Sequence, residues 1–226
     1  MALLEVCCGN PESVDAAVAG DARRIELCAS LEQNGLTPPV SWLREVKAKY
    51  PTLRVHVLIR LRAGDFVYSP EEVDTMVLQI KEALLAGADG IVIGALTPAG
   101  DIDLPAMERL VSAAGNASVT FHRAFDVCRN PFEALEQIIG LGCNRILTSG
   151  QAASALKGAK LLRELRKRAD GRIGILAGGG VTPENAAQII AETGCTEIHA
   201  SASEIIDGKK KTSAAKVEAV LKAISS

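Results

Sequence analysis

The chain has 226 residues, of which 48% are hydrophobic, 23% charged and 3% aromatic, a composition typical of a globular protein with an aliphatic core. Its net charge of −2 gives no concentrated positive face, so neither nucleic acid nor an anionic membrane is expected as a partner. No apolar run approaches the roughly 20 residues that span a bilayer, and the first residues lack the pattern of a secretory leader. These features predict a cytoplasmic protein.

Eight short apolar runs, most of them rich in β-branched side chains, are predicted to be strands. In chain order they begin at residues 3, 24, 55, 91, 119, 145, 173 and 197. Each interval between successive runs is long enough for the crossover helix that parallel neighbouring strands require. The pattern therefore predicts strands and helices that alternate along the whole chain.

The segments between the predicted strands carry their own helix signals. Ser69 followed by Pro70 predicts a helix start, and Thr182 followed by Pro183 predicts another. The second of these lies in a glycine-rich stretch, 177–185, that follows the seventh strand, where barrels often bind an anion.

Eight strand–helix units with no linker between them predict a single α/β domain over residues 1–226, folded as a (β/α)8 TIM barrel. The alternative is a doubly wound open sheet. A dinucleotide-binding sheet of that kind would carry GxGxxG after its first strand, and the sequence there is CCGNPES. The barrel is therefore the favoured fold.

The alternation of side chains along each strand predicts which residues face into the barrel. Outward side chains pack against helices and must be apolar, whereas inward ones can be polar near the C-terminal mouth. On the first two strands the apolar positions are 4, 6, 25 and 27, which leaves the intervening positions inside. The residues predicted to face inward include Glu5, Cys7, Glu26, Cys28, His56, Arg60, Thr120, His122, Glu197 and His199.

Two cysteines of this inward set suggest a metal site. All six cysteines are expected to be free thiols, because the chain lacks an export signal and is too large to need disulfides. Cys7 and Cys28 lie on neighbouring strands at matching positions, and strands are about 4.8 Å apart. A pair of thiolates selects Cu(I) or Zn(II) over hard cations. The alternative is that both are small buried hydrophobic residues.

The inward charged residues allow two further interpretations. Glu5 and Glu26 need partners inside a barrel, so they could hold together a polar plug that fills the interior. Alternatively, Glu26, Arg60 and His122 could line a pocket in which His122 is an acid or base and Arg60 holds an anionic substrate. Arg62, two residues beyond Arg60, is a further anion ligand in this hypothesis.

The segments LEVC, RIELC followed by GLTP, VHVLIRLRAGDFVYS, VTFHRAFDVCRNP, RILTSG and GGGVTPEN resemble, in order, the CutC family of copper homeostasis proteins. The resemblance covers roughly residues 3–201. It implies a TIM barrel in the cytoplasm, a role in copper tolerance, and assembly into homodimers or homotetramers. The family's proposed copper ligands correspond to Cys7 and Cys28.

The resemblance also implies a set of polar site residues that coincide with the motifs. Beyond those already named, they are Asp65, Arg123, Asp126, Thr148 and Ser149. The chain departs from the family pattern at Asn34, Leu61 and Ala63, in loops beside the mouth. The sequence therefore predicts a CutC-type protein that binds Cu(I), with an uncharacterised enzyme acting on a small phosphorylated or carboxylated metabolite as the rival hypothesis.

Overall fold

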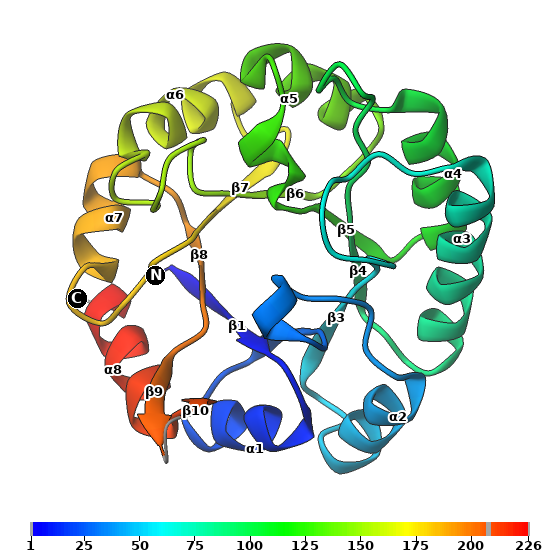
Figure 1. The fold of residues 1–226 in the computed structure, drawn as a ribbon. Coiled ribbons are helices and arrows are strands. Elements are labelled where there is room, and N and C mark those ends of the chain that lie inside the picture. Colours follow the sequence, from blue (N-terminus) through cyan, green and yellow to red (C-terminus); the bar gives the residue numbers. More distant parts are fainter. Residues whose placement is uncertain (1, 207–208, 226) are drawn as a thin grey trace.

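The computed structural model describes residues 2–206 and 209–225. Eight parallel strands pair in chain order, and β8 pairs with β1 to close the barrel (Figure 1). The predicted (β/α)8 barrel is thereby confirmed. The strands are β1 (Leu3–Cys8), β2 (Arg24–Leu27), β3 (Arg54–Leu58), β4 (Gly90–Ile93), β5 (Ser118–Phe121), β6 (Arg145–Thr148), β7 (Gly174–Gly178) and β8 (Glu197–Ala200).

Helices form an outer ring around the barrel (Figure 1). They are α1 (Pro11–Ala19), α2 (Val40–Lys49), α3 (Pro70–Leu85), α4 (Leu104–Ala114), α5 (Pro131–Gly140), α6 (Ala159–Ala169), α7 (Ala186–Thr193) and α8 (Ala214–Ser225). Two 3-10 turns, η1 (Leu31–Gln33) and η2 (Arg123–Val127), follow β2 and β5. An antiparallel hairpin of β9 (Ser203–Ile206) and β10 (Lys209–Thr212) precedes α8. Among the described helices, none has the length and apolar character needed to cross a membrane.

The helix starts show how local sequence sets the boundaries. Ser69 caps α3 by accepting from the Glu72 backbone N–H, while the Glu72 carboxylate accepts from the Ser69 backbone N–H, which is a complete capping box. The helix start expected at Thr182 is wrong, because α7 begins at Ala186. The Asn185 side chain accepts from the Thr182 backbone N–H and donates to the Gly180 carbonyl, so these residues form a turn at the mouth instead.

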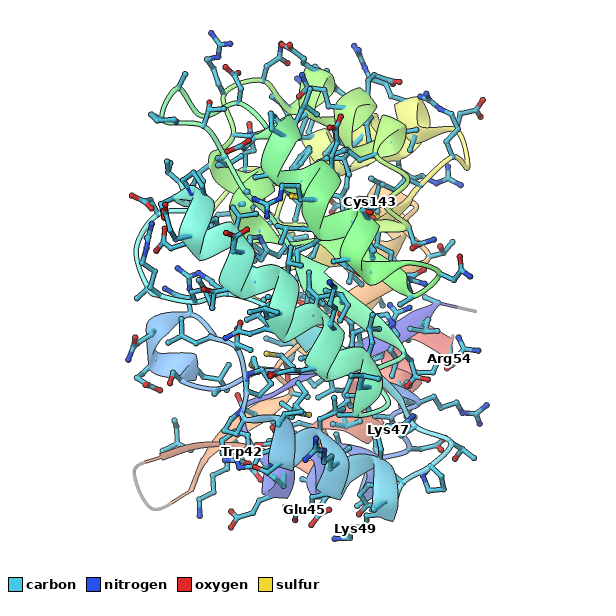
Figure 2. All side chains as sticks on the ribbon, turned by 90° about the vertical axis from the view of Figure 1, so that its right-hand side faces the viewer. Trp42, Glu45, Lys47, Lys49, Arg54 and Cys143 are labelled. Atoms are coloured by element: carbon cyan, nitrogen blue, oxygen red, sulfur yellow. The ribbon has the colours of Figure 1, made fainter. Side chains whose placement is uncertain are left out.

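The helices run antiparallel to the strands. In the side view of Figure 2, Trp42 near the start of α2 lies to the left of Lys49 at its end, and Arg54 opens β3 on the right. The carboxyl ends of the strands therefore point to the left in this view. In barrels of this kind the loops at that end build the functional site.

The outward and inward faces of the strands separate as the alternation predicts. Val55, Val57 and Ile59 belong to the large apolar core between strands and helices. Cys28, Leu58 and Val92 form a separate small cluster, with Cys7 packed against it. The barrel interior therefore combines this apolar cluster with buried polar groups.

Candidate metal and ligand site

A cavity of about 740 Å³ occupies the C-terminal mouth of the barrel. Side chains from the strands line its inner part, and residues of the loops that follow the strands line its rim. Its inner residues include Cys7, Glu26, Cys28, Arg60, His122 and His199, and its rim includes Arg123, Thr182, Glu184, Ser201 and Lys216. Most of the residues predicted to carry function therefore face one cavity at the barrel mouth.

The two predicted metal-binding cysteines meet inside this cavity. Their Sγ atoms lie 3.7 Å apart, and both cysteines are free. The backbone N–H of Cys28 donates to the carbonyl of Cys8, so the β1–β2 ladder continues to this point and fixes the separation of the thiols. Cys8 itself packs outward in the apolar core, with 0% exposure.

Glu26 and His199 complete a cluster around Cys7. One ligand atom from each of Cys7, Glu26 and His199 lies within 4.8 Å of the others, and His199 Nε2 is 3.6 Å from a Glu26 oxygen. The pairing of β1 with β2 sets Cys7 opposite Glu26, while the pairing with β8 sets Glu5 opposite His199. Strand alternation predicted that His199 faces inward, but not that it is a ligand.

Glu5 orients this cluster from below. It is fully buried, and its oxygens lie 3.0 Å from His199 Nδ1, 3.1 Å from His56 Nδ1 and 2.7 Å from Arg24 Nε. Burial raises the pKa of Glu5, but hydrogen bonds from His199 and His56 and the charge of Arg24 outweigh it, so the pKa lies well below 4.5. An ionised Glu5 thus holds the Nδ1–H of His199 and turns its Nε2 toward Cys7 and Glu26.

A second group of charges fills the bottom of the barrel. Glu197 forms ion pairs with Arg24 and Arg145, and Arg145 donates to Ser118 Oγ at 2.6 Å. The two arginines were not predicted to face inward, because a charged residue at the start of a strand ordinarily faces solvent. The alternation rule could have identified Arg24, since it lies two positions before inward-facing Glu26. Arg24 also contacts Glu5, so Glu5 belongs to this buried polar group, whereas Glu26 lies beside His199.

The site groups have displaced protonation equilibria. Burial disfavours the charged form of His199, but the neighbouring Glu26 charge and hydrogen bonds to Cys7 and Glu5 raise its pKa well above 6.5. The hydrogen bond from Cys28, together with burial, raises the pKa of the Cys7 thiol well above 9.0. Burial also raises the pKa of Glu26. Without a metal, the raised pKa values place an imidazolium at His199 beside a protonated Cys7 thiol.

His122 lies on the opposite wall and remains neutral. Its Nδ1 accepts the backbone N–H of Ala124 at 3.2 Å, which caps η2. Burial, reinforced by the charge of Arg60, lowers the pKa of His122 to about 3. Because Nδ1 accepts a hydrogen bond, the proton of the neutral ring is on Nε2, and this buried Nε2 has no hydrogen-bond partner among the described residues.

Two glycines make room for the histidine rings. A Cβ on Gly94 would lie 2.5 Å from His122 Nδ1, and a Cβ on Gly90 would lie 2.5 Å from the His56 ring. Real Cβ atoms do not approach other atoms so closely. Both positions therefore require glycine. Gly90 on β4 makes room for His56 of β3, and Gly94, just after β4, makes room for His122, which follows β5.

Arg60 is buried near His122. Its guanidinium donates to the backbone carbonyls of Gln33, Gly35 and Gly64, each at 3.0 Å, and it lies over the ring of Phe66 at 5.0 Å. Phe66 also contacts His122, with ring centroids 4.9 Å apart. Arg60 therefore ties two mouth loops to β3 through neutral acceptors.

The remaining predicted ligands divide between the cavity and its supporting loops. Asp126 lines the cavity, but its carboxylate accepts from Thr148 Oγ1, and from the backbone N–H and Oγ of Ser149. Arg62 forms ion pairs with Asp65 and with Glu72, the capping residue of α3. These contacts link loops around the mouth. Glu5, Arg62, Asp65, Thr148 and Ser149 are not among the residues lining the cavity.

The fold and site define a (β/α)8 barrel with a buried cluster of thiol, imidazole and carboxylate groups below a polar mouth. The sequence pattern of the CutC family matches residues 2–204, and the chain belongs to this family. A CutC family protein of Bacteroides fragilis is 54% identical over 90% of this chain and 81% of its own length. A CutC family protein of Parabacteroides distasonis is 49% identical over 92% of this chain and 85% of its own length.

Solved structures agree with the assignment. The crystal structure of CutC from Streptococcus agalactiae superposes with a TM-score of 0.85 at 33% identity, covering 89% of this chain and 99% of that one. Thiamine phosphate pyrophosphorylase from Pyrococcus furiosus gives a TM-score of 0.63 at 16% identity, over 99% of this chain and 95% of that one. The second likeness concerns the barrel fold alone.

Proposed function

We propose that the protein binds Cu(I) in copper homeostasis, with Cys7 and Cys28 as sulfur ligands and His199 Nε2 as a third ligand. The observation that carries this proposal is the separation of 3.7 Å between the sulfurs of half-buried Cys7 and buried Cys28, beside an imidazole whose other nitrogen contacts a buried carboxylate. Thiolate and imidazole ligands suit Cu(I). A carboxylate on the far ring nitrogen is the usual support for a metal-binding histidine.

Membership of the CutC family supports the copper assignment. The Streptococcus agalactiae CutC structure is described as that of a candidate copper homeostasis protein. In this chain the thiols, the imidazole and Glu26 stand together in the cavity. The residues present therefore fit a soft metal ion.

The protonation states indicate which protons a bound cation would displace. The His199 imidazolium, with its raised pKa, places a positive charge between Glu5 and Glu26. A bound metal ion would replace the Nε2 proton and the thiol protons, because ligand groups must be deprotonated. The cation would then lie between Glu5 and Glu26, where the imidazolium supplies the positive charge in the metal-free protein.

The same protonation states disfavour a nucleophilic role for Cys7. Cys7, His199 and Glu5 have the order of a nucleophile, a base and an orienting carboxylate. A catalytic thiol, however, has a lowered pKa, whereas Cys28 and burial raise that of Cys7. A metal ion would offset the free-energy cost of deprotonating Cys7, because it binds the thiolate directly. A substrate carbonyl would not offset this cost.

A competitive titration under reducing conditions tests the copper proposal. The protein and the chelator bicinchoninate compete for Cu(I), and the absorbance of the chelate reports the metal that the protein removes. The wild type is expected to take up one tight equivalent. The Cys7→Ala/Cys28→Ala double variant is expected to lose it, and His199→Gln to weaken it.

Cys8→Ala is the matched control, because Cys8 is adjacent in sequence but packs outward in the apolar core. It should retain the wild-type equivalent. Equal uptake by the double variant and the wild type would show that the metal binds elsewhere. A parallel titration with Zn(II) establishes whether the site prefers Cu(I).

We also propose that the protein works in the cytoplasm as a homodimer or homotetramer. A reducing compartment suits its free cysteines. Leu78 and Leu85 on α3 are 61% and 88% exposed, and a second subunit would cover such apolar side chains. Light scattering during gel filtration measures the mass, and a purely monomeric species would contradict the assembly.

The rival hypothesis, an enzyme that uses His122 as acid or base and Glu26 as its partner, stays a prediction, because, within the described residues, no contact between these two supports it. Glu26 lies beside His199, whereas the contacts of His122 are with Ala124 and Phe66. A pKa of about 3 makes His122 a weak base, since an efficient general base has a pKa near the working pH. We therefore propose no reaction.

A further inference from the structure

We propose that the upper wall of the cavity, formed by Arg60 and His122, binds the carboxylate or phosphate group of a small anionic molecule. None of the proposed copper ligands takes part in this second site. The inference rests on a buried cation without a carboxylate partner, a buried donor without an acceptor, and the open cavity that both residues line.

Arg60 provides the charge. It is 4% exposed, and the described residues place no carboxylate within ion-pair distance of it, although Arg24, Arg62 and Arg145 all have such partners. Three backbone carbonyls accept from its guanidinium, the Tyr68 hydroxyl lies nearby, and its buried Nε has no hydrogen-bond partner among the described residues. Carbonyls and a phenol are dipoles and leave the positive charge uncompensated, which is costly in a buried place.

The charges below Arg60 do not compensate it either. Glu5 and Glu197, the lowest inward carboxylates, contact Arg24, Arg145, His56 and His199, and Glu26 contacts His199. Among the described ion pairs none of these carboxylates contacts Arg60, so a negatively charged ligand would be the group that neutralises its guanidinium.

His122 provides a directed donor. It is 4% exposed and its Nε2 lacks a hydrogen-bond partner among the described residues. The Ala124 backbone N–H occupies Nδ1, which fixes the tautomer with a proton on Nε2. A buried donor left unpaired costs about as much as a lost hydrogen bond, and a ligand oxygen would accept this N–H.

The two residues lie on one level of the barrel. Leu58, the last residue of β3, pairs with Val92, so Arg60, two residues beyond the end of β3, reaches the level of Gly94, two residues beyond Val92. Gly94 is the residue whose Cβ would strike the His122 ring. Phe66 contacts both the guanidinium and the imidazole and holds them on one wall of the cavity.

The donor set indicates the chemical class of ligand. An arginine and a neutral N–H donor suit a planar carboxylate or a tetrahedral phosphate, because both offer several oxygen acceptors to fixed N–H groups. At about 740 Å³, the cavity is large enough for a small metabolite. At the rim, Arg123 and Lys216 pair with Asp126 and Glu184, so the anion would be held by Arg60 and His122 below them.

The test measures binding of two probes, inorganic phosphate and malonate, to the metal-free reduced protein by isothermal titration calorimetry. Saturable binding of at least one probe is expected, and the probe that binds more tightly identifies the class. Arg60→Gln should weaken that binding about tenfold or more, because it removes the charge from the hydrogen bonds. His122→Asn should weaken it several-fold, since asparagine can still cap η2 but lacks the Nε2 donor.

Arg62→Gln is the matched control, because Arg62 is two residues away, has carboxylate partners and does not line the cavity. It should leave the affinity unchanged. Failure of both probes to saturate the wild type, or an equal loss in Arg62→Gln, would overturn the proposal. If Arg60→Gln does not fold, wild-type affinity in His122→Asn would overturn it in the same way.

The outcome is separable from that of the copper proposal. The Cys7→Ala/Cys28→Ala variant should bind the anionic probe like the wild type, because its substitutions leave Arg60 and His122 in place. An NMR titration of the imidazole nitrogens gives a second readout. The His122 Nε2 resonance should shift on addition of the probe, and an unchanged resonance would contradict the assigned donor.

Discussion

Replacing Glu5 with glutamine tests whether one buried carboxylate both stabilises the barrel and prepares the metal site. The substitution keeps the shape of the side chain but removes the charge that faces Arg24, His56 and His199. Removing one partner of a buried ion pair typically costs about 3–5 kcal/mol. Because Glu197 still pairs with Arg24, we expect the lower end, about 3 kcal/mol.

A thermal melt of the metal-free protein measures this loss. For a domain of this size, 3 kcal/mol corresponds to a fall in Tm of about 6–12 °C. Glu136→Gln is the matched control, since Glu136 pairs with Arg172 at the surface, where an ion pair contributes little. Its Tm should be close to that of the wild type.

The same variant should bind Cu(I) about 10- to 100-fold more weakly, because Glu5 orients His199 and raises its basicity as a ligand. The competitive titration with bicinchoninate measures this change. A Tm equal to that of Glu136→Gln would refute the stabilising role of the network. Full Cu(I) affinity in a folded Glu5→Gln protein would refute the role of Glu5 in the metal site.

Three further predictions follow from the packing and the pKa directions. Gly94→Ala should lower the free energy of unfolding by about 1–3 kcal/mol, because the new Cβ would strike His122. Gly140→Ala is the control: its Cβ enters open space, and the change should stabilise α5 by about 0.5–1 kcal/mol. Equal melting temperatures of the two variants would contradict this. NMR should show His122 neutral from about pH 5 to 8, because its pKa is about 3, and titration in that range would be inconsistent. Because the pKa of His199 is raised in the folded protein, its contribution to stability is complete below pH 6.5 and is lost as the pH rises through the folded pKa. If Tm depends on pH in the same way in His199→Gln and in the wild type, this contribution is excluded.

Acid should weaken the same network through Glu5. Because the folded-state pKa of Glu5 is lowered, its contribution is present above pH 4.5 and is lost as the pH falls through the folded value. Stability of the metal-free protein is therefore greatest between the two losses. Cu(I) affinity, in contrast, should rise with pH, because His199 and the thiols must release protons to bind it.

Much of the site could be predicted from strand alternation. Because side chains of a strand alternate between two faces and the outer face packs against helices, apolar residues at 4, 6, 25 and 27 were enough to place Glu5, Cys7, Glu26 and Cys28 inside. The same rule excludes Thr148 from the cavity, since Ile146 packs in the outer core and Thr148 shares its parity. Its hydroxyl donates to Asp126 of η2 instead.

The sequence by itself determined the barrel, the inward face of each strand and the residue types available there, because these depend on local alternation and on the spacing of strands and helices. Only the tertiary structure decided which inward groups meet. Closure of β8 onto β1 brings Glu5 to His199, 194 residues away in the chain, and leaves Arg60 among carbonyls rather than carboxylates. Such meetings depend on the register and stagger of the whole ring, which no single segment of the sequence encodes.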